Sequence, residues 1–173
     1  YLIAFYGIWS MGAVILPINS KLHTKEVGWI LENAGCAYVL CEESSISEIN
    51  FLGVTVFNPK WQQFDSNTHI PPVKRSSTDL AWLFYTSGTT GRPKGVMITH
   101  GMIKTMALSY FADVDQVYPS DTTLYAAPMS HGAGLYSIMH VLAGARHAIP
   151  VSGGFDEEEI FGLAETLQNI HMF

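Results

Sequence analysis

Apolar side chains are spaced along the chain in two ways: as stripes with helical periodicity and as short continuous runs typical of buried strands. Residues 1–18 carry no charge, and the pattern predicts a buried helix over 1–11, a turn at Gly12 and a buried strand over 13–18. A membrane-spanning helix is the alternative for an apolar stretch of this length. Two glycines and a proline interrupt the run and no basic residues precede it, so we favour the buried helix and strand.

A second helix is predicted after Thr24, which is placed to cap it, and Gly35 is placed to end it in a left-handed conformation. A buried strand over 36–41, a short helix over 44–50 and a strand over 54–57 follow. The order helix, strand, helix, strand predicts an α/β fold in which a mainly parallel sheet is covered by helices.

The second half of the chain continues the alternation. Apolar runs predict strands over 80–85, 96–98, 122–128 and 146–151, and helical stripes predict helices over 100–111, from Leu135 to a stop at Gly144, and after 156. The last helix opens with an acidic cluster in which Asp156 and Glu159 form a capping-box-like pair. We favour this capping role over a metal site, because the capping pattern has a mechanism of its own.

A polar, proline-containing stretch over 58–79 separates the two halves. Such a composition is typical of a surface connection, and the chain is long enough for about one domain. We therefore predict one partial domain over 1–173, made of an α/β segment over 1–57, the connecting loop, and a second α/β segment over 80–173.

Composition narrows the class of protein. Hydrophobic residues make up 48% of the 173 residues, charged residues make up 14%, and the net charge is −6. A charged fraction below the ~25% typical of soluble domains suggests that part of the surface packs against protein outside this sequence. The negative charge argues against a nucleic-acid footprint. Cys36 and Cys41 do not form a C-x-x-C pair, which favours a reduced, cytoplasmic setting.

The stretch from Tyr85 to Val96 is the strongest candidate for binding chemistry. It places three glycines, an arginine, a lysine and several hydroxyls in a polar loop between two predicted strands. Glycines allow backbone N–H groups to form a concave anion site, while Lys94 adds a mobile positive charge and Arg92 a planar donor group. The loop would suit the phosphate tail of a nucleoside triphosphate. It is not a Walker A loop, because proline precedes the lysine and glycine follows it.

The whole loop, with Thr99-His100 at the usual distance behind it, resembles the phosphate loop of the adenylate-forming (AMP-binding) enzyme superfamily. That superfamily includes acyl-CoA synthetases, nonribosomal adenylation domains and luciferases. Residues 12–19 resemble its early motif, and residues 128–134 resemble its proline-x-x-histidine motif. The resemblance implies part of the large N-terminal domain of an acyl-CoA synthetase-like fold.

The resemblance also implies a reaction. Its members activate a carboxylic acid, here a fatty or other organic acid, with Mg-ATP to an acyl-adenylate and then transfer the acyl group to coenzyme A. His131 would place the acid or gate its pocket, and Lys94 would act at the phosphates, both as catalytic residues. The β- and γ-phosphates of ATP would be bound by the following residues: Thr86, Ser87, Gly88, Thr89, Thr90, Gly91 and Lys94. No residue is assigned to a metal.

Three later features of the superfamily are absent from the sequence: the tyrosine-glycine-x-threonine-glutamate motif, the ribose-binding aspartate motif, and the C-terminal domain with its catalytic lysine. We therefore expect a piece of a longer polypeptide that cannot complete the reaction alone. A non-catalytic module that binds a nucleotide or phosphate is the alternative. A membrane-associated fragment led by residues 1–18 is a further one.

Other chemistries lack their motifs in this sequence. It contains no G-x-S-x-G nucleophile elbow, no G-x-G-x-x-G fingerprint and no zinc-ligand spacing. Aromatic residues lie in apolar runs and are not interleaved with basic residues as a nucleic-acid platform requires. The partner that the family resemblance implies is a small-molecule carboxylic acid, and we expect no nucleic acid and no transmembrane segment.

Overall fold

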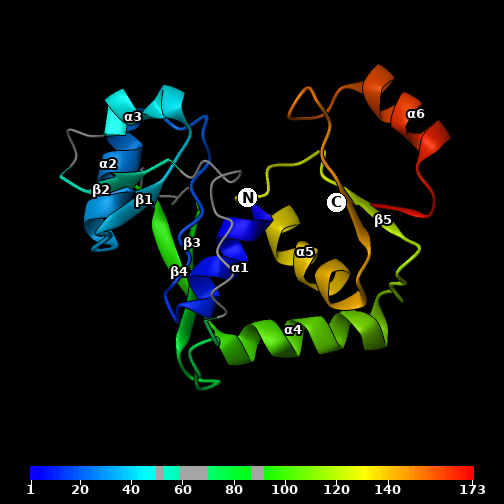
Figure 1. Ribbon diagram of the computed structural model, residues 1–173, viewed down its shortest axis with the longest axis horizontal. Coiled ribbons are helices and arrows are strands. Elements are labelled where there is room, and N and C mark those ends of the chain that lie inside the picture. The colour runs from blue at the N-terminus through cyan, green and yellow to red at the C-terminus, as the bar shows by residue number, and fades with distance from the viewer. Residues whose placement is uncertain (50–52, 59–69, 87–91) are drawn as a thin grey trace.

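The computed structural model describes residues 1–49, 53–58, 70–86 and 92–173 (Figure 1). Its helices are α1 (Leu2–Ser10), α2 (Thr24–Asn33), α3 (Glu43–Ile49), α4 (His100–Asp113), α5 (Gly132–Ala143) and α6 (Glu157–Thr166). Its strands are β1 (Tyr38–Leu40), β2 (Thr55–Phe57), β3 (Leu80–Thr86), β4 (Lys94–Thr99), β5 (Thr122–Leu124), β6 (Arg146–Ala148) and β7 (Ile170–Met172). The predicted phosphate-loop residues Ser87, Gly88, Thr89, Thr90 and Gly91 lie outside the described ranges.

The described strands form three small sheets. β1 and β2 pair in parallel, and β5 lies between β6 and β7 with both pairings parallel. β3 and β4 pair in the antiparallel direction, as the predicted strand, loop and strand require. Most pairings are parallel and helices pack beside the strands, which confirms the predicted α/β class (Figure 1).

The strand predicted over 13–18 is reduced to a single parallel bridge. Ile15 N–H donates to the Ala81 carbonyl at 3.0 Å, and Leu83 N–H donates to the Ile15 carbonyl at 2.8 Å, so the segment joins β3. Ile15 is buried, as predicted, at 4% exposure. Gly12 makes the predicted turn out of α1 with a φ of 72°, a left-handed conformation that favours glycine.

The N-cap of α2 is His23, not the predicted Thr24. His23 Nδ1 accepts a hydrogen bond from the Lys25 N–H, and the Glu26 carboxylate accepts one from the His23 N–H, each at 3.2 Å. This reciprocal pair is a capping box in which an imidazole takes the place of a hydroxyl. Gly35 follows the helix with a φ of 63°, the left-handed conformation predicted for it.

The small sheet of β1 and β2 is more exposed than predicted. Tyr38 and Leu40 on β1 are 64% and 42% exposed, and Phe57 on β2 is 49% exposed. Only the middle residue of each three-residue strand is half-buried. The apolar run over 36–41 therefore forms the predicted strand, but one of its faces is open.

The main core forms where α1, α4 and α5 meet β3 (Figure 1). Trp82 and Met139 are 0% exposed, and Phe5 is 2% exposed. The rings of Phe5 and Trp82 meet edge to face with their centroids 5.0 Å apart. Burial of side chains of this size contributes roughly 2–3 kcal/mol each. This packing fixes β3, the strand that enters the phosphate loop, against the helices.

The apolar beginning of the chain is the part for which a membrane span is the alternative. It forms α1, which has 9 residues and buries Phe5 in the core. No helix within the described ranges is both long enough and apolar enough to cross a membrane.

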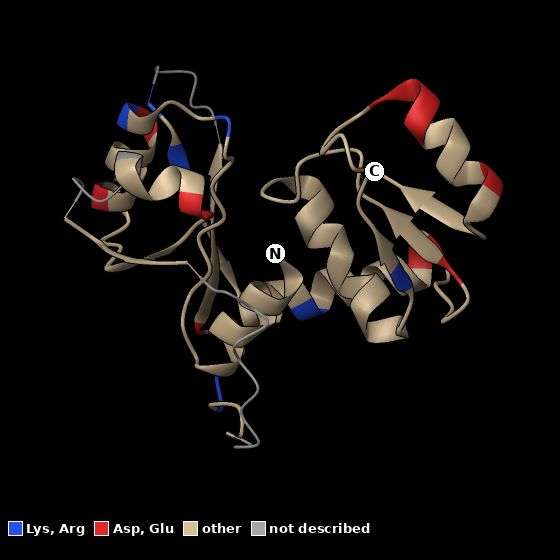
Figure 2. Cartoon of the chain, turned by 45° about the horizontal axis from the view of Figure 1, so that its top comes forward, with Lys and Arg blue, Asp and Glu red and all other residues tan. Residues whose placement is uncertain are grey.

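Acidic side chains gather at the start of α6 (Figure 2). Asp156 Oδ1 accepts a hydrogen bond from the Glu159 N–H at 2.9 Å, which confirms Asp156 as the cap of this helix. The Glu159 carboxylate is used differently from the prediction. It accepts hydrogen bonds from the backbone N–H groups of Val151 and Ser152, so it stabilises the loop before the helix.

Candidate functional site

The β3–β4 hairpin carries both ends of the predicted phosphate loop. In the antiparallel register Thr86 on β3 lies opposite Lys94 on β4, and this pair ends the ladder on the loop side. Lys94 is exposed, and Thr86 is half-buried. A hydroxyl residue and a positively charged residue therefore flank the loop, one on each strand.

Tyr85 fixes the same end of β3 to α2. Its hydroxyl donates to Asn33 Oδ1 at 2.7 Å, and its ring meets the Trp29 ring edge-on at a centroid separation of 6.2 Å. Burial raises the pKa of Tyr85, so the hydroxyl keeps its proton and donates. A Cβ at Gly95 on the facing strand would lie 2.9 Å from the Tyr85 ring, so only glycine fits there without movement of the ring.

His131 is the N-cap residue of α5, on the turn that leads from β5 into this helix. Its N–H donates to the Pro128 carbonyl at 3.0 Å, and its own carbonyl accepts from the Gly134 N–H at 2.9 Å. The imidazole makes no capping hydrogen bond, and the residue is exposed. The backbone thus forms the turn while the ring remains available to a ligand.

Phe84 brings this turn to β3. The Phe84 and His131 rings meet at an interplanar angle of 65° with their centroids 5.0 Å apart. Phe84 precedes Thr86 by two residues on the strand that enters the phosphate loop. Within the described residues no hydrogen bond joins His131 to Thr86 or Lys94, so the structure places these residues on neighbouring elements and not in a bonded pair.

Tyr125 follows β5 and contacts the neighbouring strand β6. Its hydroxyl oxygen lies 2.7 Å from His147 Nδ1, and the two rings stack with centroids 5.8 Å apart. Burial raises the pKa of Tyr125 to about 12 and lowers the pKa of His147. At neutral pH the phenol therefore keeps its proton and the imidazole is uncharged.

Three histidines meet between α5 and the sheet of β5, β6 and β7. His140 on α5 is 0% exposed, and its ring centroid lies 5.0 Å from that of His171 and 6.5 Å from that of His147. Its Nδ1 lies 3.0 Å from the Tyr136 carbonyl, whereas its Nε2 is buried with no hydrogen-bond partner among the described residues. Burial lowers the pKa of His140. No three His, Cys, Asp or Glu side chains in the described ranges are arranged to hold a metal ion.

Asp121 links the beginning of β5 to β7. Its Oδ2 lies 3.4 Å from His171 Nε2 and accepts a hydrogen bond from the Tyr118 N–H at 2.7 Å. Asn169 Nδ2 donates to its other oxygen at 3.1 Å. These partners, above all the Tyr118 N–H, lower the pKa of Asp121, so it is a carboxylate at neutral pH.

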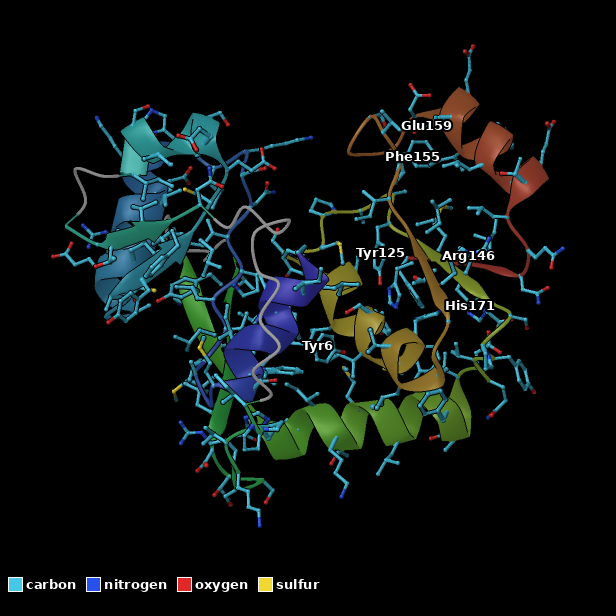
Figure 3. The ribbon with its side chains drawn as sticks, in the orientation of Figure 1. Tyr6, Tyr125, Arg146, Phe155, Glu159 and His171 are labelled. Carbon is cyan, nitrogen blue, oxygen red and sulfur yellow. The ribbon has the colours of Figure 1, made fainter. Side chains whose placement is uncertain are left out.

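An apolar cavity of about 330 Å³ lies at the carboxyl ends of β5 and β7, where open α/β sheets bind ligands. It is lined by Ala126, Ala127, Phe155, Met172 and Phe173. Hydrogen bonds from Ser152 and Val151 hold the Glu159 carboxylate and lower its pKa, and this fixes the loop that carries Phe155 (Figure 3). A larger cavity of about 580 Å³ along α2 is lined by no predicted site residue among those described.

The chain matches the model of one protein family, the AMP-binding enzymes, over residues 1–173. It belongs to the AMP-binding enzyme family. This confirms the resemblance that the phosphate loop and the histidine motif indicated.

Two relatives show the range of proteins that this AMP-binding chain resembles. It is 33% identical over 147 residues to the long-chain-fatty-acid–CoA ligase FadD13 of Mycobacterium tuberculosis. The aligned region covers 78% of this chain and 29% of that protein. It is 29% identical over 154 residues to gramicidin S synthase 2 of Aneurinibacillus migulanus. The aligned region covers 86% of this chain and 3% of that protein. The chain thus spans less than a third of either relative.

Solved structures of AMP-binding relatives have the same fold. ATP-bound MatB from Rhodopseudomonas palustris matches with a TM-score of 0.83 and 25% identity, over 98% of this chain and 36% of that chain. The o-succinylbenzoate CoA synthetase MenE from Bacillus subtilis, solved with the acyl-adenylate intermediate OSB-AMP, matches with a TM-score of 0.82 and 24% identity, over 96% and 44%. The predicted acyl-CoA synthetase-like fold is therefore confirmed.

The sequence alone predicted the two ends of the phosphate loop and His131 as site residues, but not the residues that hold them. The contact between Tyr85 and Asn33 joins a strand to a helix far earlier in the chain, and no sequence pattern signals it. The approach of Tyr85 to Gly95 could have been found, because counting outward from a hairpin loop pairs these two positions.

Proposed function

We propose that the parent protein of this chain is an AMP-forming acid–thiol ligase. It activates a carboxylic acid with Mg-ATP to an acyl-adenylate and then transfers the acyl group to coenzyme A. The observation that carries the proposal is the contact between Phe84 and His131, because it brings an imidazole beside the strand that enters the phosphate loop. Membership of the AMP-binding family supports the adenylation step, and the likeness to a CoA ligase supports coenzyme A as the acceptor.

The proposed reaction has two displacement steps. A carboxylate oxygen of the acid attacks the α-phosphorus of ATP, and pyrophosphate leaves with the electron pair of the broken P–O bond. The thiolate sulfur of coenzyme A then attacks the acyl carbon, and AMP leaves. Negative charge grows on pyrophosphate in the first transition state, so positioned donors and positive charge at the β- and γ-phosphates lower the barrier.

Each predicted site residue has a role in this scheme. The position of Lys94 opposite Thr86 supports a role at the phosphates, and the contact of His131 with Phe84 supports a role in orienting the carboxylate of the acid. The phosphate contacts are assigned to Thr86, Ser87, Gly88, Thr89, Thr90, Gly91 and Lys94. Since no cluster of three ligands for a metal ion exists among the described residues, none of them is assigned to Mg²⁺.

The apolar cavity at the ends of β5 and β7 supports a fatty or other organic acid as the substrate. Its lining, which includes Phe155 and Phe173, offers an apolar chain an open apolar surface to contact. The name of FadD13 states a long-chain fatty acid for that relative.

We also place the parent protein in the cytoplasm, where ATP and coenzyme A are available. Cys36 and Cys41 are both free thiols, as expected in a reducing compartment. Localisation of a fluorescently tagged parent protein tests this assignment, and export from the cytoplasm would contradict it.

The proposal is tested by acid-dependent exchange of labelled pyrophosphate into ATP, measured with the full-length parent protein and dodecanoate, malonate or L-phenylalanine. Exchange with at least one acid is expected. The Lys94→Ala variant should lose at least about tenfold in kcat/KM, because one positive charge at the leaving group is removed. Lys104→Ala on α4, also an exposed lysine, is the matched control and should keep its activity.

Two results would overturn this function. ATP binding that depends on Lys94 with no exchange for any of the three acids would favour the non-catalytic nucleotide-binding module. Undiminished exchange in Lys94→Ala would show that this loop does not hold the leaving group. Formation of the acyl-CoA product after addition of coenzyme A separately tests the acceptor.

A further inference from the structure

The turn that carries His131 is attached to α1 by one hydrogen bond. The Tyr1 hydroxyl donates to the Met129 carbonyl at 2.7 Å, a contact between residues 128 positions apart. Tyr1 is the N-cap residue of α1, and Met129 lies two residues before His131. The bond therefore crosses from the beginning of a core helix to the backbone of the candidate site.

The same Met129 carbonyl is confined from its other side by Gly134. A Cβ at Gly134 would lie 1.9 Å from the Met129 oxygen and 3.4 Å from the Trp82 ring, so the carbonyl rests directly against the glycine. With the His131 carbonyl bonded to the Gly134 N–H, the backbone of the turn has contacts on both sides.

The two segments that this hydrogen bond joins also contact one group of packed aromatic rings. Tyr1 contacts Phe5 at a centroid distance of 6.0 Å, and Phe5 contacts Trp82 at 5.0 Å. Trp82 contacts Phe84 at 6.2 Å, and Phe84 contacts His131 at 5.0 Å. Tyr1 and His131 therefore lie at the two ends of one series of contacting rings. A second connection between them runs through Met129, whose carbonyl accepts the hydrogen bond from Tyr1 and which precedes His131 by two residues.

We propose that Tyr1 is a positioning residue for His131. Its hydroxyl holds the Met129 carbonyl and thereby keeps the turn in the one arrangement in which the imidazole rests against Phe84. Tyr1 does not touch the acid or ATP in this scheme. What the positioned imidazole does for the acid depends on the function proposed above, whereas the positioning itself does not.

The positioning is tested by chemical labelling of His131 with diethyl pyrocarbonate in the full-length protein, followed by mass spectrometry. The Tyr1→Phe variant keeps the ring contacts and loses the hydroxyl. Because the imidazole then leaves Phe84 more often, its labelling rate should rise by about threefold or more, as one hydrogen bond is lost. Phe84→Leu should raise the rate in the same direction. Tyr118→Phe, at a ring that is 59% exposed, is the control and should leave the rate unchanged.

A kinetic split tests the consequence for the substrate. With dodecanoate, Tyr1→Phe should raise the KM for the acid by about threefold to tenfold and leave the KM for ATP within about twofold, because only the carboxylate end is misplaced. An equal rise in both constants would mean a general structural role and overturn the proposal. Unchanged His131 labelling in both Tyr1→Phe and Phe84→Leu would also overturn it. If none of the three acids is activated, the proposed function fails while the labelling experiment still decides the positioning.

Discussion

The Tyr85 side chain donates a hydrogen bond to Asn33 and covers Gly95 with its ring, so one residue joins α2 to both strands of the phosphate-loop hairpin. The contact lies one residue before Thr86, where the described part of β3 ends. A displacement of Tyr85 would therefore be passed directly to the loop.

Removal of the Tyr85 hydroxyl should affect ATP more than the acid. In Tyr85→Phe we expect a loss of about 1 kcal/mol in stability, since one intramolecular hydrogen bond is removed. The KM for ATP should rise by about twofold to fivefold, with little change in the KM for the acid. Melting temperatures and exchange kinetics of the parent protein provide the measurement. A rise confined to the acid would contradict the link between Tyr85 and the loop.

A methyl group at Gly95 should displace the Tyr85 ring. Gly95→Ala places its Cβ 2.9 Å from that ring, closer than side chains approach one another in proteins. The cost should be about 1–3 kcal/mol, as for other overpacked sites. Gly162→Ala in α6 is the control, because nothing lies within 4 Å of a Cβ there. Thermal unfolding of both variants and of the wild type makes the comparison. If Gly95→Ala were as stable as the wild type, the Tyr85 ring would be able to move aside at no cost in stability.

Acidification should lower the free energy of unfolding, because it protonates the buried histidines His140 and His147. Burial lowers the pKa values of His140 and His147, so below about pH 6.5 the unfolded chain binds more protons than the folded chain. Their contribution is complete above that pH and is lost as the pH falls toward the lowered folded values. Among the groups near His140, His171 adds to this effect, while Asp121 and Asp115 oppose it.

The measurement is the fall in melting temperature of the parent protein between about pH 7.5 and about pH 5.5. It should be larger for the wild type than for His140→Leu, which has one imidazole fewer to protonate. An identical fall in both proteins would mean that His140 is not kept neutral by burial.

The 173-residue chain should not support the reaction by itself. It spans 29% of FadD13, and it lacks the later motifs that the family resemblance implies for a complete enzyme. We expect no acid-dependent pyrophosphate exchange from the purified chain at concentrations where the parent protein is active. Measurable exchange by the short chain would contradict this expectation.

Local chemistry explains which parts of the fold were predictable. The hairpin, the helix beginning at His100 and the end of α5 at Gly144 each depend on residues close together in the sequence, and each was predicted correctly. The cap of α2 was assigned to Thr24 because hydroxyls are common caps, but Glu26 can pair with the N–H of His23 and this pairing moved the cap by one residue.

The rest depends on contacts that no local pattern encodes. The exposure of Tyr38 and Leu40 reflects what covers a short sheet, and an apolar run contains no information on its neighbours. The meeting of His140, His147 and His171 requires α5 to lie across the sheet of β5, β6 and β7, whereas in the sequence these histidines follow no ligand spacing.

Glu159 has a wider role than completing the first turn of a helix. Its carboxylate belongs to the first turn of α6 and at the same time grips the backbone of the loop that carries Phe155, one wall of the apolar cavity. A tilt of this outer helix would therefore be transmitted to the hollow beneath the loop. The shape of this cavity is therefore set in part by a helix on the outside of the protein that contributes no residue to its lining.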